Sequence, residues 1–299
     1  MSHSAQIDRI IEVYRDMRFM QEQRKRLDLA FQAFVRTLCG YSTHLPAKER
    51  GPLLKRAQAI VDGRAPDDPL VSRVEIMREG SDAAAAAVSK IERQKQRELE
   101  SIVKGLPIWT EWAADIRGLG AKSIGIIIGE AGDLGAYPKN PEKRIGRSAR
   151  EIRRYGEAEI RKRMGVAVID GIAQGKLGKG ATAEDWIVHG YNAKRRSALY
   201  TIGAAIVKQA DSPYRAIYLE RKRIEKERFE ARGYTVKPSA EIKKAEAGAC
   251  ISLGHIDRRA QRWMEQRVLR HMYRAWLRTM VEDRPEARDI HAEEERPTA

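Results

Sequence analysis

A glycine turn is the first candidate for binding chemistry in this 299-residue chain. It reads Arg117-Gly118-Leu119-Gly120 and is followed by Lys122, Ser123 and a run of aliphatic residues. We expect both glycines to take backbone angles that a Cβ forbids, so that the turn lies flat against an anion. A helix starting there would add its unpaired amides and the Lys122 charge. The pattern predicts a phosphate contact; the alternative is a plain connection between two packed helices.

A serine beside a basic run is the second candidate. Lys194, Arg195 and Arg196 precede Ser197 at the expected start of a helix. Basic side chains neutralise phosphates, and a serine hydroxyl activated by its neighbours can act as a nucleophile. The simpler interpretation places Ser197 on a helix surface with no part in chemistry. We therefore predict phosphate contacts from the three cations and keep Ser197 as the candidate nucleophile.

Other titratable residues form no recognisable site. Cys39 and Cys250 lie far apart and in no metal-ligand spacing, which favours a reducing compartment such as the cytoplasm. His189 and His255 have no ligand cluster around them, so we interpret them as structural. Asp115, Glu130 and Asp133 could in principle hold Mg²⁺, but the first two fall on separate expected helices. We predict no metal and no cofactor.

A further set of basic residues lies on the last expected helix: Arg258, Arg259, Arg262 and Arg267. They can form a track for phosphates or a solvated helix face, and the sequence leaves both interpretations open. Trp263 and Trp276 share nearly the same face of that helix, which indicates core packing rather than base stacking.

Composition points to a polyanionic partner. Lys and Arg number 57 against 42 acidic residues, a formal net charge of +15. Such an excess repels itself unless a polyanion relieves it, and nucleic acid is the first candidate, ahead of an anionic membrane. No apolar stretch is long enough to span a bilayer and the N-terminus does not resemble a signal peptide, so we expect no membrane.

Hydrophobic periodicity predicts an all-α, or nearly all-α, protein. We expect a long helical hairpin over residues 1–105, a candidate coiled coil that pairs two copies, then a compact helical domain over 106–282 and a disordered acidic tail over 283–299. The expected helices cover 5–38, 53–61, 81–104, 183–188, 194–209, 214–232 and 257–281. We expect Ser81 and Asp82 to cap the third of them, a strand or extended loop over 165–180, a loop over 233–248, and a basic helix after Ser148 within 142–163.

The run from Ile116 to Leu134, which contains Gly129-Glu130-Ala131-Gly132-Asp133, resembles the start of the C-terminal domain of the insertion sequence one-hundred-ten and one-hundred-sixteen transposases. In that family a glycine-apolar segment and a helix with a paired basic start follow, here matched by Gly165–Gly171 and Gly190–Tyr200. The resemblance covers roughly 112–209. It identifies the glycine turn as a helix-hairpin-helix motif and implies binding of double-stranded DNA during transposition or recombination.

Two departures from the family limit what the resemblance implies. Full transposases carry an N-terminal RuvC-like domain with four carboxylates, and no strand–Asp pattern of that kind occurs here. Where the family has a Ser-Gly pair, this chain has Gln174-Gly175, and an amide cannot attack phosphorus. We therefore expect a DNA-binding protein without the full catalytic apparatus. An active recombinase using Ser197 and a non-enzymatic RNA-binding or nucleoid protein remain open alternatives.

Overall fold

The computed structural model describes residues 3–134, 157–169, 171–246 and 248–280. Most of the basic stretch 142–163 and the tail 283–299 lie outside the described residues. Over the described part, α-helices dominate and the strands have two or three residues each, so the all-α expectation is confirmed. None of the described helices combines the length and the apolarity needed to cross a bilayer.

The chain divides into two compact units, one formed by residues 12–98 and the other by residues 1–11 together with 99–299. The sequence places a boundary near residue 105, whereas the second unit takes up the chain again at Leu99 and also includes the described residues up to Ile11. Ile7 and Ile10 are buried there, and the same long helix continues from them into the first unit.

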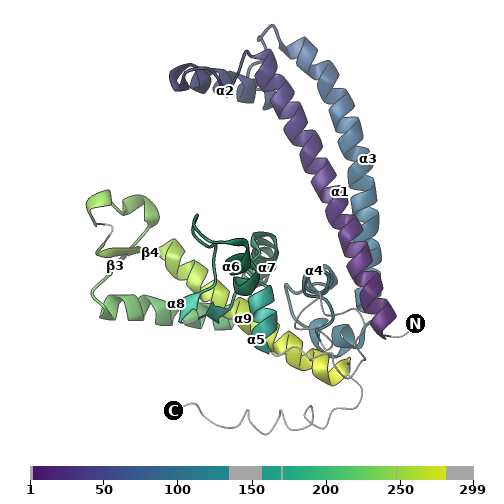
Figure 1. Ribbon diagram of the computed structural model, residues 1–299, viewed down its shortest axis with the longest axis vertical. Helices are drawn as coiled ribbons and strands as arrows, with labels where there is room; N and C mark the ends of the chain where they lie inside the picture. Colours follow the sequence, from purple (N-terminus) through teal and green to yellow (C-terminus); the bar gives the residue numbers. More distant parts are fainter. Residues whose placement is uncertain (1–2, 135–156, 170, 247, 281–299) are drawn as a thin grey trace. The chain divides into compact units, whose positions relative to one another are not determined.

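Three helices build the unit of residues 12–98: α1 (His3–Leu38), α2 (Ala47–Val61) and α3 (Val71–Lys104). Within it, α1 and α3 run antiparallel (Figure 1). Arg24 Nε lies 3.1 Å from Glu92 Oε2, and Lys95 Nζ lies 3.0 Å from Asp16 Oδ2. The expected helical hairpin is thus present, and α2 belongs to the segment that connects its two long helices.

The start of α3 corrects the expected helix start at Ser81 and Asp82. The helix begins ten residues earlier, at Val71, and Ser81 lies inside it. Asp68 provides the start signal, because its Oδ1 accepts a hydrogen bond from the Leu70 amide at 3.0 Å. Gly80 is a poor helix former, but packing of the long hairpin outweighs this local cost. α2 likewise begins before Leu53, at Ala47.

In the second unit the longest helix is α9 (Leu253–Thr279), against which α5 (Glu157–Arg163), α7 (Ala193–Val207) and α8 (Pro213–Ala231) pack. Its apolar stripe, from Ile256 through Met264 and Val268 to Trp276, is buried. Trp276 is a core residue as expected. Trp263 is only half-buried. α9 begins earlier than residue 257 because the Ser252 hydroxyl caps it by accepting from the His255 amide.

Shorter elements complete this unit: the π-helix Trp109–Ala113, α4 (Ala121–Ala131), α6 (Ala183–His189), and the 3₁₀ turns Ser239–Glu241 and Lys244–Glu246. Strands β1 (Val168–Ile169) and β2 (Ile172–Ala173) pair antiparallel, with Ile169 opposite Ile172. Strands β3 (Thr235–Lys237) and β4 (Cys250–Ser252) pair in parallel. The expected loop over 233–248 thus contains a strand and two helical turns.

Candidate nucleic-acid interface

The two glycines of the turn differ in conformation. Gly118 has a φ of +86°, the left-handed region that favours glycine. Gly120 is extended, with φ −73° and ψ 165°, angles that any residue adopts. The expectation of forbidden angles is therefore confirmed at Gly118 and wrong at Gly120. Gly120 is instead the N-cap residue of α4, and its carbonyl accepts from the Ser123 amide at 2.8 Å.

The side of the turn at Gly118 faces the protein. A Cβ built on Gly118 would lie 2.7 Å from Ile206 Cα and 3.2 Å from the Ala205 carbonyl oxygen, both in α7. The turn is therefore locked against another helix by a backbone contact that only glycine permits. A Cβ on Gly120 would meet no atom within 4 Å, so the open side of the turn lies at the start of α4.

The charge of Arg117, beside the turn, is accessible. Arg117 Nε lies 3.4 Å from Asp211 Oδ2, and the two side chains are 73% and 65% exposed. An ion pair this exposed contributes little to stability, so a phosphate can compete with Asp211 for the guanidinium. Lys122 and Ser123, in the first turn of α4, are half-buried.

The flanking elements match the expected motif only in part. α4 packs closely: Ile124 and Ile127 are buried, and Gly125 lies so near Leu99 that a Cβ would approach its Cγ to 2.7 Å. The helix before the turn, in contrast, is the single π-helical segment Trp109–Ala113. The helix-hairpin-helix assignment thus stays a prediction.

The second basic segment is mostly engaged inside the protein. Arg195 Nε lies 3.3 Å from Glu130 Oε2, and Arg196 Nη1 lies 2.9 Å from Glu265 Oε2, whose side chain is 1% exposed. A phosphate would have to compete with a carboxylate at each arginine. Lys194 is exposed at the start of the same helix. The packing thus favours a structural role for Arg195 and Arg196.

Glu265 is the most perturbed acid of the described residues. Burial raises its pKa to about 7, against the lowering effect of the Arg196 charge and of a hydrogen bond from Gln261. Gln261 Nε2 donates to Glu265 Oε1 at 2.9 Å and to the Tyr200 carbonyl at 2.8 Å. The α7 backbone approaches so closely that a Cβ on Gly203 would lie 2.7 Å from Glu265 Oε1.

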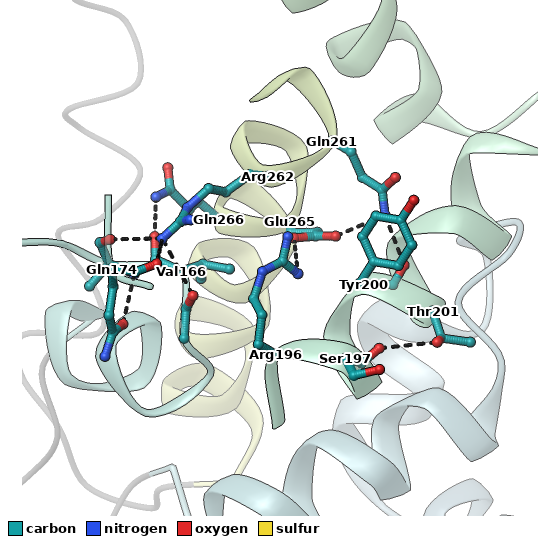
Figure 2. A network of polar contacts seen from close by, with 12 residues as sticks. Val166, Gln174, Arg196, Ser197, Tyr200, Thr201, Gln261, Arg262, Glu265 and Gln266 are labelled. Carbon is teal, nitrogen blue, oxygen red and sulfur yellow. Dashed lines mark hydrogen bonds and ion pairs between the residues drawn. The ribbon is translucent and has the colours of Figure 1, made fainter. Parts of the chain in front are cut away.

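Beside this acid, Arg262 holds a run of backbone carbonyls (Figure 2). Its Nη2 donates to the carbonyl oxygens of Ala167 at 3.1 Å and Gln174 at 2.8 Å, and more weakly to that of Gly165 at 3.4 Å. Gln266 Nε2 donates to the Val166 carbonyl. Burial, together with the Arg196 charge, lowers the pKa of Arg262. Arg262 therefore holds in place the segment that carries β1 and β2.

Gln174, which stands at the family's serine position, is a structural residue. Its side chain is 2% exposed. Its Oε1 accepts from the Ala167 amide at 3.3 Å, and its Nε2 donates to the His189 carbonyl at 2.9 Å. Both ends of the amide are thus used to join the β1–β2 segment to the end of α6.

Ser197 is exposed on α7 and lies on the opposite side of Arg196 from Gln174 in Figure 2. Its carbonyl accepts a hydrogen bond from the Thr201 hydroxyl at 3.0 Å. Within the described ranges, no imidazole or carboxylate hydrogen-bonds its hydroxyl. The arrangement that would activate a serine nucleophile is therefore not among the described contacts.

The described residues contain no group of three or more His, Cys, Asp or Glu side chains placed to hold a metal ion. Glu130 pairs with Arg195, and Asp133 Oδ1 accepts from the Trp276 indole at 3.1 Å. Two of the acids considered for Mg²⁺ thus have structural contacts of their own.

Sequence reasoning did not identify the contacts of Arg262 with backbone carbonyls or the buried acid Glu265. The available signal was two polar residues, Gln261 and Glu265, beside the apolar stripe of α9.

Comparison of the chain with protein-family models, with curated protein sequences and with solved structures found no match in any of the three.

Proposed function

We propose that this chain binds double-stranded DNA through the phosphate backbone, using the open side of the glycine turn at the start of α4. The observation that carries the proposal is the asymmetry of the turn. Gly118 is packed against α7, whereas no protein atom would lie within 4 Å of a Cβ on Gly120. A backbone phosphate can therefore approach the first amides of α4 without displacing protein.

Charge supports the same proposal. The net charge of +15 favours a polyanion, and Arg117 presents a largely exposed guanidinium at the turn. Amides at a helix start bind phosphate oxygens. Because these contacts grip backbone rather than base edges, the expected binding has little sequence preference.

The resemblance of residues 112–209 to transposases supports placing this binding in DNA transposition or recombination, in the cytoplasm. Gln174 in place of the family's serine argues for binding without strand cleavage. RNA and a separate RuvC-like partner are alternatives that the same experiments can address.

The proposal is tested by Gly120→Val in a gel-shift titration with a short duplex. Valine adopts the extended angles of Gly120, and its Cβ would meet no protein atom within 4 Å, yet the side chain would cover the first amides of α4. We expect affinity to fall by about tenfold, the effect of losing roughly 1.4 kcal/mol of binding free energy. Unchanged affinity in a variant with a wild-type thermal midpoint would remove the turn from the DNA site.

The charge contribution is tested separately, with Arg117→Gln combined with Lys122→Gln. If each cation contacts one phosphate, the slope of log affinity against log salt concentration decreases by about 0.9 for each phosphate that is no longer neutralised. The matched control is Lys243→Gln with Lys244→Gln, two exposed lysines between α8 and α9. Equal slopes in the two double variants would show that only overall charge matters.

A further inference from the structure

A small pocket lies between α5 and α9, which pack side by side in the second unit (Figure 1). It is lined by Glu157, Arg161, Trp263, Gln266, Arg267 and Arg270, and its volume is about 60 Å³. One water needs roughly 10–15 Å³ of such space. The pocket therefore admits a group of a few heavy atoms, the size of a phosphoryl group, and is too small for a nucleobase.

The lining carries a positive excess. Three guanidiniums face one carboxylate, which leaves two positive charges. Glu157 is shared, with Oε1 at 3.1 Å from Arg161 Nη2 and Oε2 at 3.1 Å from Arg270 Nε. An arginine has five N–H donors, so one carboxylate leaves donors on both side chains. Of the described residues, none accepts a hydrogen bond from Arg270 Nε itself, although this atom lies within ion-pair distance of the carboxylate.

Arg267 is positioned by the Trp263 indole. Its guanidinium carbon lies 5.3 Å from the ring centroid, one helical turn along α9. Arg221, from α8, stacks on the same ring at 4.3 Å. Within the part of the chain that the structure describes, no carboxylate pairs with Arg267. Its guanidinium is therefore held at the pocket by an aromatic contact, which leaves its N–H groups available and reduces the entropy lost when it binds an anion.

We infer that this pocket binds a phosphoryl group, with Arg267 as the principal ligand and the outer donors of Arg161 and Arg270 as its partners. Planar guanidiniums match the oxygens of a phosphate, and bidentate contacts of this kind are among the strongest hydrogen bonds in proteins. The phosphoryl group can belong to a free phosphate or phosphomonoester, or to a nucleic acid backbone. Only the second source rests on the proposed function.

The inference is tested by calorimetric titration of the full-length protein with inorganic phosphate at constant ionic strength. We compare Arg267→Gln with Arg278→Gln, which removes an exposed charge from the same helix outside the pocket. We expect Arg267→Gln to weaken phosphate binding at least fivefold and Arg278→Gln to change it less than twofold. Arg267→Lys keeps the charge without the planar fork and is expected to restore part of the affinity.

Equal phosphate affinity in the two glutamine variants, both with wild-type circular dichroism and thermal midpoint, would overturn the inference. A duplex DNA titration separates the two sources. If Arg267→Gln also weakens DNA binding, the pocket binds a backbone phosphate; if it weakens phosphate alone, the ligand is a small phosphorylated molecule. Gly120→Val, which alters the turn and leaves the pocket intact, should retain wild-type phosphate affinity in the pocket even if the proposed DNA site proves wrong.

Discussion

The carboxyl group of Glu265 is almost completely buried beside Arg196, and burial raises its pKa from 4.5 to about 7. The folded protein therefore holds a proton that the unfolded chain releases between about pH 4.5 and 7. The stabilisation from this group is complete below the unfolded pKa and is lost as the pH rises through the folded one.

We expect urea unfolding to detect this loss. From pH 4.5 to pH 8, wild type should lose up to roughly 3 kcal/mol of unfolding free energy relative to Glu265→Gln, in which the amide stays neutral. Parallel pH dependences in the two proteins would contradict the assignment. Because each protein carries the same other titratable groups, the comparison isolates the contribution of Glu265.

Valine substitutions at Gly118 and at Gly120 should lower the unfolding free energy to different extents. Valine at 118 must take a φ of +86° and approach Ile206 Cα to 2.7 Å, and each effect costs roughly 1–3 kcal/mol. We expect Gly118→Val to lower the unfolding free energy by at least about 2 kcal/mol, whereas Gly120→Val should cost about 1 kcal/mol or less. Denaturant unfolding measures both, and similar losses would contradict the packing of the turn against α7.

At the scale of elements, the segment with β1 and β2 depends on α9. Its two-residue strands provide little stability of their own, and Arg262 supplies three carbonyl contacts from another element. Hydrogen bonds from charged donors contribute about 1.5–3 kcal/mol. We therefore regard Arg262 as a support for this segment rather than as a phosphate ligand.

Replacement of this arginine should loosen the segment locally. In Arg262→Met, we expect the amides of Ala167 and Gln174, which bond across the segment, to exchange hydrogen at least tenfold faster. Arg258→Met, at an exposed position of the same helix, is the control and should leave both rates unchanged. After proteolysis, a single peptide that spans residues 167–174 contains both amides, and mass spectrometry follows its hydrogen exchange. Wild-type exchange in Arg262→Met would show that Gln174 alone holds the segment.

At the scale of the whole molecule, self-association stays a prediction. In the unit of residues 12–98, several large apolar side chains are exposed along α1 and α3: Phe19, Leu29, Ile76, Met77 and Ile91. Apolar surface of this kind on long helices favours pairing with a second copy. The exposed fraction of Ile76 is 71%, so of these five side chains it contributes least to packing within one copy of the chain.

Sedimentation velocity tests this prediction. We expect wild type to sediment as a dimer at micromolar concentration. Ile76→Asp should raise the dimer dissociation constant at least tenfold, because a charge at an apolar interface must be desolvated. Lys90→Asp, at an exposed polar position of α3, is the control for the added negative charge. A monomeric wild type at these concentrations would contradict the prediction.

Three properties of the fold could be predicted from the residues alone: the helical class, the left-handed glycine at 118, and the bounds of α1, α6, α7 and α8 within one or two residues. These properties follow from local periodicity, caps and the absence of a Cβ, which neighbouring residues specify. The start of α3 was missed because its Asp68 signal precedes a stretch where Gly80 and Ser81 suggest an interruption.

Which basic residues keep their charge available depends on contacts between distant parts of the chain. Arg195 meets Glu130 across 65 residues, and Arg262 meets the Gly165 carbonyl across 97. No spacing rule connects partners so distant, because packing of separate helices brings them together. For the same reason, the sequence could not separate Arg262, which holds backbone carbonyls, from Arg267, whose guanidinium lies at the edge of a phosphate-sized pocket.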